Sequence, residues 1–71
     1  MTFPEALKRA RKRKGASQAL SASAAHISNT QYQNYEYGKS EPTLSVLIAL
    51  ADFFDVSLDY LAGRSDDPTR H

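Results

Sequence analysis

Apolar residues recur every three or four positions in the stretches 3–14 and 44–54, whereas 18–25 has only a weak apolar side and 28–37 is short and polar; polar or glycine-containing turns separate these stretches and a last one at 58–61. An α-helix turns by about 100° per residue, so this spacing places the apolar residues on one side of a helix. No stretch shows the alternation of apolar and polar residues that predicts a strand. The pattern and its turns therefore predict an all-α fold with five helices, over about 3–14, 18–25, 28–37, 44–54 and 58–61.

Capping residues mark the ends of these helices. Thr2, with Glu5 three positions later, predicts a capping box, and Gly15 is typical of the residue just after a helix. Ser28 with Gln31 predicts a second capping box. The remaining boundaries are expected at Ser17, Gly38, Thr43, Ser57 and Gly63.

The stretch 44–54 is the most apolar of the five. We expect its core-facing side to consist of Leu44, Leu47, Ile48, Ala51 and Phe54. Further apolar residues occupy most of the remaining circumference, namely Val46, Ala49, Leu50 and Phe53. This helix is therefore expected either to be buried on two sides or to offer its surplus apolar surface to a partner.

Charge is distributed unevenly, although the net charge is only +1. Six of the nine Lys and Arg residues lie between Lys8 and Lys14, whereas the acidic residues lie mainly in the second half. A basic first third is compatible with a polyanionic partner, but such a run is more often a solvated helix face. Arg11 differs from the other cations because it falls only about 40° from Leu7, at the margin of the buried side.

Composition argues against several classes of function. The chain has no cysteine, which removes disulfides and thiolate metal sites. Its two histidines, His26 and His71, do not make a metal site, and its three glycines are too dispersed for a phosphate-binding loop. We therefore expect no metal, no cofactor and no enzymatic activity. No run approaches the roughly 20 apolar residues that span a bilayer, so we expect no membrane partner and a cytoplasmic location.

The stretches 18–25 and 28–37 have the form of a helix-turn-helix, joined at His26-Ile27. On the second helix, polar side chains share an arc of roughly 140°. Asn and Gln can bond adenine bidentately, and hydroxyls can bond several base edges. An ordinary exposed helix usually carries Glu, Lys and Arg, which this arc lacks, so it predicts a surface that reads DNA bases. The arc consists of Asn29, Thr30, Gln33, Asn34 and Tyr37, with Tyr32 and Tyr35 opposite.

Glu36 lies between the aromatic side and the polar arc of this helix, just as Arg11 lies at the edge of the core side of the first helix. We predict an Arg11–Glu36 ion pair that fixes the reading helix against the first helix. Removing one partner of a buried pair is costly because the other charge stays buried.

Four segments together resemble the Cro/XRE (lambda-repressor-like) family of helix-turn-helix DNA-binding proteins: Ser17-Gln18, Ile27-Ser28, 34–42 and 51–61. The resemblance covers about residues 3–63. It implies a compact five-helix, lambda-repressor-like bundle, with a DNA-binding domain at 1–63. The residues 64–71 are polar, and for that reason we expect them to form a frayed tail. The resemblance further implies a bacterial or phage-encoded transcriptional repressor, which binds a pseudo-palindromic operator in double-stranded DNA as a homodimer.

The resemblance also implies roles for individual residues. Base contacts are expected from Ser28, Asn29, Thr30, Gln33 and Asn34. Contacts to the DNA backbone are expected from Ser17, Gln18, Tyr37, Gly38, Lys39 and Ser40. The chain departs from the family where Ser21 and Ala25 replace large aliphatic residues and Tyr32 replaces a smaller one. We expect the Tyr32 ring to fill that space, because cores tolerate exchanges that conserve volume. His26 stands where glycine is usual, and we expect it to adopt a positive φ.

A protein-interaction module, such as a small partner-binding or antitoxin-like adaptor, is the main alternative. Its binding surface would be the surplus apolar side chains of the stretch 44–54. The two hypotheses differ in an accessible property, because DNA affinity falls steeply with salt whereas an apolar protein interface responds little.

Overall fold

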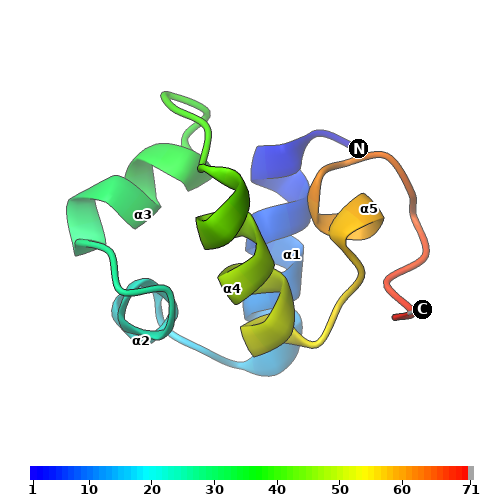
Figure 1. Ribbon diagram of the computed structural model, residues 1–71, viewed down its shortest axis with the longest axis horizontal. Coiled ribbons are helices and arrows are strands. Elements are labelled where there is room, and N and C mark those ends of the chain that lie inside the picture. The colour runs from blue at the N-terminus through cyan, green and yellow to red at the C-terminus, as the bar shows by residue number, and fades with distance from the viewer. Residues whose placement is uncertain (71) are drawn as a thin grey trace.

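The computed structural model describes residues 1–70, and these form five α-helices and no strand. The helices are α1 (Phe3–Lys14), α2 (Gln18–Ala24), α3 (Asn29–Glu36), α4 (Leu44–Phe54) and α5 (Leu58–Leu61). In Figure 1, α4 crosses the middle of the molecule in front of α1, with α2 and α3 on one side and α5 on the other. The predicted all-α, five-helix fold is confirmed.

Every helix begins after a Ser or Thr whose side-chain oxygen accepts a backbone N–H of the first turn. Each such cap stabilises its helix by about 1 kcal/mol. The Thr2–Glu5 capping box is complete, because the two residues bond in both directions. The second predicted box is only half formed, since Gln31 Nε2 donates to the Tyr35 hydroxyl at 2.8 Å instead of returning to Ser28.

Two tyrosines of α3 are among the largest fully buried side chains, so α3 is anchored by its aromatic side. Tyr32 and Tyr35 are 0% and 1% exposed. The Phe3 ring of α1 packs edge-on against Tyr35, with 6.3 Å between ring centroids. The aromatic core contacts therefore hold α3 in place while leaving its opposite side open.

The buried side of α4 agrees only in part with the one that the sequence predicts. Ala51 and Phe54 are buried as predicted, but Leu44 and Ile48 are 68% and 41% exposed and Leu50 is fully buried. The apolar residues expected to be surplus, among them Val46 and Phe53, pack against the core. The helix is thus rotated by roughly 50° from the prediction, at about 100° per residue, because a helix that is apolar almost all round gives little contrast between its sides.

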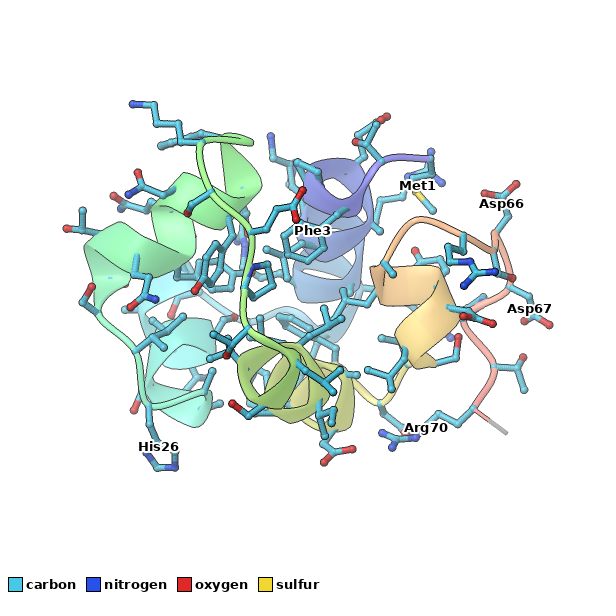
Figure 2. All side chains as sticks on the ribbon, turned by 45° about the horizontal axis from the view of Figure 1, so that its top comes forward. Met1, Phe3, His26, Asp66, Asp67 and Arg70 are labelled. Carbon is cyan, nitrogen blue, oxygen red and sulfur yellow. The ribbon has the colours of Figure 1, made fainter. Side chains whose placement is uncertain are left out.

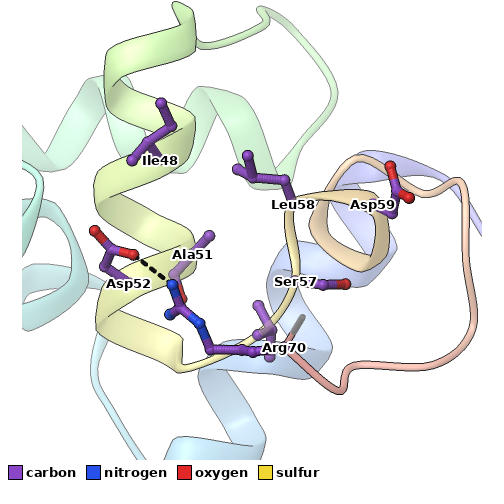
Figure 3. A pocket seen from close by; sticks show the side chains of 8 residues that line it. Ile48, Ala51, Asp52, Ser57, Leu58, Asp59 and Arg70 are labelled. Carbon is purple, nitrogen blue, oxygen red and sulfur yellow. Dashed lines mark hydrogen bonds and ion pairs between the residues drawn. The ribbon is translucent and has the colours of Figure 1, made fainter.

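The C-terminal segment is not frayed over residues 64–70. Ser57 donates its backbone N–H to the Pro68 carbonyl at 3.0 Å. Arg70 donates to the Ala51 carbonyl at 3.2 Å and to Asp52 at 2.7 Å (Figure 3). The segment therefore lies against the end of α4. The sequence does not predict this contact, because the residues of the segment are polar and show no pattern that indicates packing. His71 lies outside the described residues.

Two residues other than glycine adopt a positive φ. His26 has φ 58°, as predicted for the turn between α2 and α3, and Figure 2 shows its side chain at the edge of the molecule. Asp55, which ends α4, has φ 56° and was not anticipated. Aspartate is among the residues that tolerate this conformation best after glycine.

Gly63 combines a positive φ of 83° with a close backbone contact. A Cβ there would collide with the Met1 carbonyl oxygen and lie 3.0 Å from the Thr2 carbonyl carbon. Gly15 has a similar φ of 75° with open space around it, so Gly15→Ala is a matched control. We expect Gly15→Ala to cost about 1–2 kcal/mol of backbone strain and Gly63→Ala to cost distinctly more in urea-induced unfolding. Equal losses would show that the contact with Met1 is relieved without cost.

Candidate nucleic-acid interface

The exposed side of α3 carries the polar arc. Asn29 and Thr30 are exposed, and Gln33 and Asn34 are half-buried where the arc meets the rest of the molecule. Tyr37, directly after the helix, is 61% exposed. Four of the five residues predicted for base contacts therefore share one surface, on the opposite side of α3 from the buried tyrosines, and the fifth, Ser28, caps the start of the helix.

An ion pair joins α3 to α1. Arg11 Nε donates to Glu36 Oε2 at 2.7 Å, and Arg11 Nη2 donates to Glu36 Oε1 at 3.3 Å. The third guanidinium nitrogen donates to the Ala16 carbonyl at 3.2 Å. The Glu36 side chain is 1% exposed and that of Arg11 is 16% exposed. The pair expected from the sequence is thus present in two-point geometry, which fixes orientation as well as distance.

Gln18 extends this contact to α2 and to the polar arc. Its Nε2 donates to Glu36 Oε1 at 3.1 Å, and its Oε1 accepts from Gln33 Nε2 at 3.4 Å. One continuous chain of polar contacts therefore runs from Arg11 through Glu36 and Gln18 to Gln33. The sequence predicted only its first link, because the direction of a glutamine amide depends on which acceptors the fold brings near it.

These polar contacts limit how the side chains of Gln18 and Gln33 can bind DNA. Both amides already make bonds within the protein, but Gln18 donates only one of its two amide hydrogens, so the other hydrogen and its backbone N–H are the donors left for the predicted phosphate contact. Gln33 keeps one amide hydrogen and its carbonyl oxygen for a base edge. Gln33 is consequently held in one orientation before it meets a base.

The segment after α3 is exposed but differs in detail from expectation. The N–H groups of Gly38 and Lys39 donate to the carbonyls of Tyr35 and Asn34, at 3.2 and 2.8 Å. These two donors close the end of the helix and are not free for phosphate. The exposed Lys39 side chain and Ser40 remain as candidate contacts there.

The capping serines are likewise partly engaged. The hydroxyl oxygens of Ser17 and Ser28 accept backbone N–H groups, from Leu20 at 2.9 Å and from Gln31 at 3.1 Å. Both serines are exposed, and each hydroxyl hydrogen remains available to a phosphate or a base acceptor.

Residues 7–61, most of the chain, match the helix-turn-helix family. The chain belongs to this family. The resemblance to its Cro/XRE branch is confirmed, because curated relatives are HTH-type regulators. The domain is 42% identical over 66 residues to YqaE of Bacillus subtilis (strain 168), an uncharacterized HTH-type transcriptional regulator, covering 92% of this chain and 57% of that protein. It is 39% identical over 64 residues to RstR, a cryptic phage CTXphi transcriptional repressor from Vibrio cholerae, covering 90% and 57%.

Two solved structures match this helix-turn-helix domain over a larger share of their own length than the two curated relatives do. The P22 c2 repressor in complex with a synthetic operator superposes with a TM-score of 0.85 at 26% identity, over 92% of this chain and 98% of that one. The DNA-binding domain of the P22 c2 repressor in solution gives 0.81 at 28% identity, over 86% and 80%. The fold is therefore that of lambda-like repressor domains, although the chain spans only somewhat more than half the length of the two curated relatives.

Tyr32 is the most unusual residue of the helix-turn-helix. It shares the buried core with Ala22 and Ala25 of the small-residue segment, and the neighbouring Ser21 is also fully buried. Its hydroxyl is the one buried side-chain polar atom within residues 1–70 that lacks a hydrogen-bond partner. Burial raises the pKa of Tyr32 above its ordinary range, and the nearby Glu36 raises it further. The phenol therefore stays neutral, and Tyr32 stabilises the domain through the packing of its ring in the core.

The ionisation of Glu36 keeps the helix-turn-helix anchored to α1. Burial pushes the pKa of Glu36 up, but the hydrogen bonds from Arg11, the nearby Tyr32 hydroxyl and the hydrogen bond from Gln18 together more than offset this, so the net pKa lies below its ordinary value. The hydrogen bond to Glu36 in turn raises the pKa of Arg11. Both partners are therefore charged at neutral pH.

Other kinds of site receive no support from the part of the chain that the structure describes. Within residues 1–70, no three His, Cys, Asp or Glu side chains gather in a way that would hold a metal ion. None of the five helices is both long and apolar enough to cross a bilayer.

Proposed function

We propose that this domain binds double-stranded DNA sequence-specifically as a transcriptional repressor and reads the major groove with α3. The observation that carries the proposal is the division of α3 into two sides. Tyr32 and Tyr35 are buried, while the amides of Asn34 and Gln33 border an open polar surface that contains no charged residue. Amide side chains suit adenine in the major groove. The P22 c2 repressor, whose structure is similar, was solved with operator DNA.

The proposed contacts divide by chemistry. Ser28, Asn29, Thr30, Gln33 and Asn34 are assigned to base edges, which provide specificity. Ser17, Gln18, Tyr37, Lys39 and Ser40 flank them and are assigned to the sugar-phosphate backbone, which positions the domain. Gly38 is left out of this set, because its N–H already donates to the Tyr35 carbonyl. We assign residues 1–63 to the DNA-binding domain and 64–71 to the tail. The proposed action is binding rather than catalysis, in the cytoplasm of a bacterium or of a phage-infected cell.

We further propose that two copies bind one operator through contacts between their α4 and α5 helices. Ile48 and Leu58 line the same groove and remain 41% and 42% exposed, which leaves an apolar strip for a second copy. Figure 1 shows α5 at the opposite end of the molecule from α3, so this contact would leave both reading helices free. Such dimers read half-sites about 34–36 Å apart.

Selection of bound duplexes from a random pool tests the proposal. We expect enrichment of a pseudo-palindrome whose half-site centres lie about 10–10.5 base pairs apart, with affinity that falls steeply as salt rises. Recovery of random sequence, with affinity that salt does not change, would instead favour a protein-interaction module.

Thr30→Ala and Asn34→Ala test the reading surface itself. Each is expected to weaken binding to the selected site by about 1–3 kcal/mol, roughly five- to 150-fold, and to relax preference at one base pair. Thr69→Ala, the same substitution in the C-terminal segment, is the matched control and should leave affinity unchanged. Equal affinities for Thr30→Ala and Thr69→Ala would remove Thr30 from the interface.

A further inference from the structure

The basic run of α1 divides into two sets of side chains in the structure. Lys8, Arg9 and Lys12 line a shallow groove that also includes Glu36 of α3. Lys14 belongs to another surface, because its Nζ lies over the Phe53 ring of α4, 4.8 Å from the centroid. Only one part of the run therefore adjoins the proposed DNA interface.

Two of the residues that line the groove connect it to that interface. Pro4 packs against the turn after α3, since a Cβ at Gly38 would lie 3.6 Å from Pro4 Cγ. Glu36 is bonded to Gln18 of α2. Lys8 and Lys12 follow Pro4 at intervals of four residues, so they form a row along one side of α1, one helical turn of about 5.4 Å apart.

Among residues 1–70, the cations of this row have no acidic partner. The two acidic residues of the groove are already occupied: Glu5 accepts from Thr2 and Glu36 accepts from Arg11 and Gln18. Within residues 1–70, neither Lys8 nor Lys12 forms a salt bridge, and both are exposed. Their charge is thus free to meet an external anion, in contrast to Arg11, whose charge serves the fold.

We propose that Lys8 and Lys12 bind phosphate groups of the DNA backbone outside the segment contacted by α3 and its flanking turns. The inference rests on the proposed DNA-binding function and enlarges its footprint onto α1. Lysine binds phosphate as a point charge without reading sequence. The row therefore contributes affinity and salt dependence equally at operator and at unrelated DNA, and it contributes no base preference.

The test compares two doubly substituted domains with equal loss of charge. Lys8→Gln/Lys12→Gln removes the row, and Arg13→Gln/Lys14→Gln removes two cations from other sides of the same helix. Glutamine is close to lysine and arginine in helix propensity, so thermal unfolding should show both variants folded. Affinity is measured against salt concentration for the selected operator and for an unrelated duplex of equal length.

We expect the plot of log affinity against log salt to lose about 0.9 of its negative slope per missing phosphate contact, thus about 1.8 for Lys8→Gln/Lys12→Gln. Operator and unrelated duplex should weaken by the same factor. The Arg13→Gln/Lys14→Gln slope should stay that of the unmodified domain. Equal slopes for both variants would overturn the inference, as would weakening confined to the operator. If the unmodified domain showed no sequence-selective binding at all, the proposed function itself would fall, which is a separate outcome.

Discussion

Arg11→Met is expected to lower the free energy of unfolding by about 3–5 kcal/mol. Methionine keeps much of the aliphatic packing but leaves the Glu36 carboxylate, whose side chain is 1% exposed, without its two-point partner. Since Glu36 also holds Gln18, the proposed reading surface should loosen and DNA affinity should fall as well. Urea-induced unfolding and a binding titration measure the two effects. Unchanged melting temperature and affinity would refute the role of the pair.

The pH dependence gives this prediction a second readout. The pKa of Glu36 is lowered in the folded domain, so its contribution to stability is present above its unfolded-state pKa and is lost as pH falls through the folded pKa. Without Arg11, burial dominates and raises the Glu36 pKa, which favours protonation on folding. The stability gap between the two proteins should therefore narrow on acidification. Arg11→Met/Glu36→Gln, which removes the unpaired charge, should recover part of the loss at neutral pH.

Tyr32→Ala is expected to cost about 3–5 kcal/mol, as truncation of a large buried aromatic does. The ring is 0% exposed and lies in the core with Ala22 of the small-residue helix α2 and with Ala25, which directly follows that helix. These residues cannot expand to fill the cavity that alanine would leave. A loss of unfolding free energy well under 1 kcal/mol would mean that the neighbouring helices move into the space, so that the ring is not needed to fill it.

Tyr32→Phe separates the ring from the hydroxyl. Because the Tyr32 hydroxyl has no hydrogen-bond partner although it is buried, phenylalanine removes an unsatisfied polar atom and keeps the volume. We expect stability equal to or slightly above that of the unmodified domain, measured under the same conditions as Tyr32→Ala. A substantial loss in Tyr32→Phe would reveal a bond to that oxygen, for instance through a buried water.

Local signals in the sequence were sufficient for the helices and their ends. Caps act within one turn, so Thr2, Ser17 and Ser57 mark helix starts whatever packs around them. The Arg11–Glu36 pair was within reach for a similar reason, since each residue lies at the margin of an amphipathic side. In both cases the position of a residue on its own helix was enough to decide its role.

What depended on packing between helices was not available from the sequence. Leu44 and Ile48 are exposed because the neighbours of α4 select among several apolar sides that the sequence leaves equivalent. Gln18 turns inward because the fold brings Glu36 and Gln33 within reach of its amide. The contacts of Arg70 on α4 join segments that share no local pattern.

The position of the C-terminal segment has a practical consequence for labelling. Arg70 ties this segment to the end of α4, and Figure 1 shows it at the end of the molecule away from α3. A fluorophore or an affinity tag joined beyond it would extend away from the proposed duplex. A small label there should therefore report binding without touching the DNA, provided that it leaves open the groove of Ile48 and Leu58, which Arg70 also lines and which we propose for the second copy. A label placed on the turn after α3 would instead compete with the phosphates.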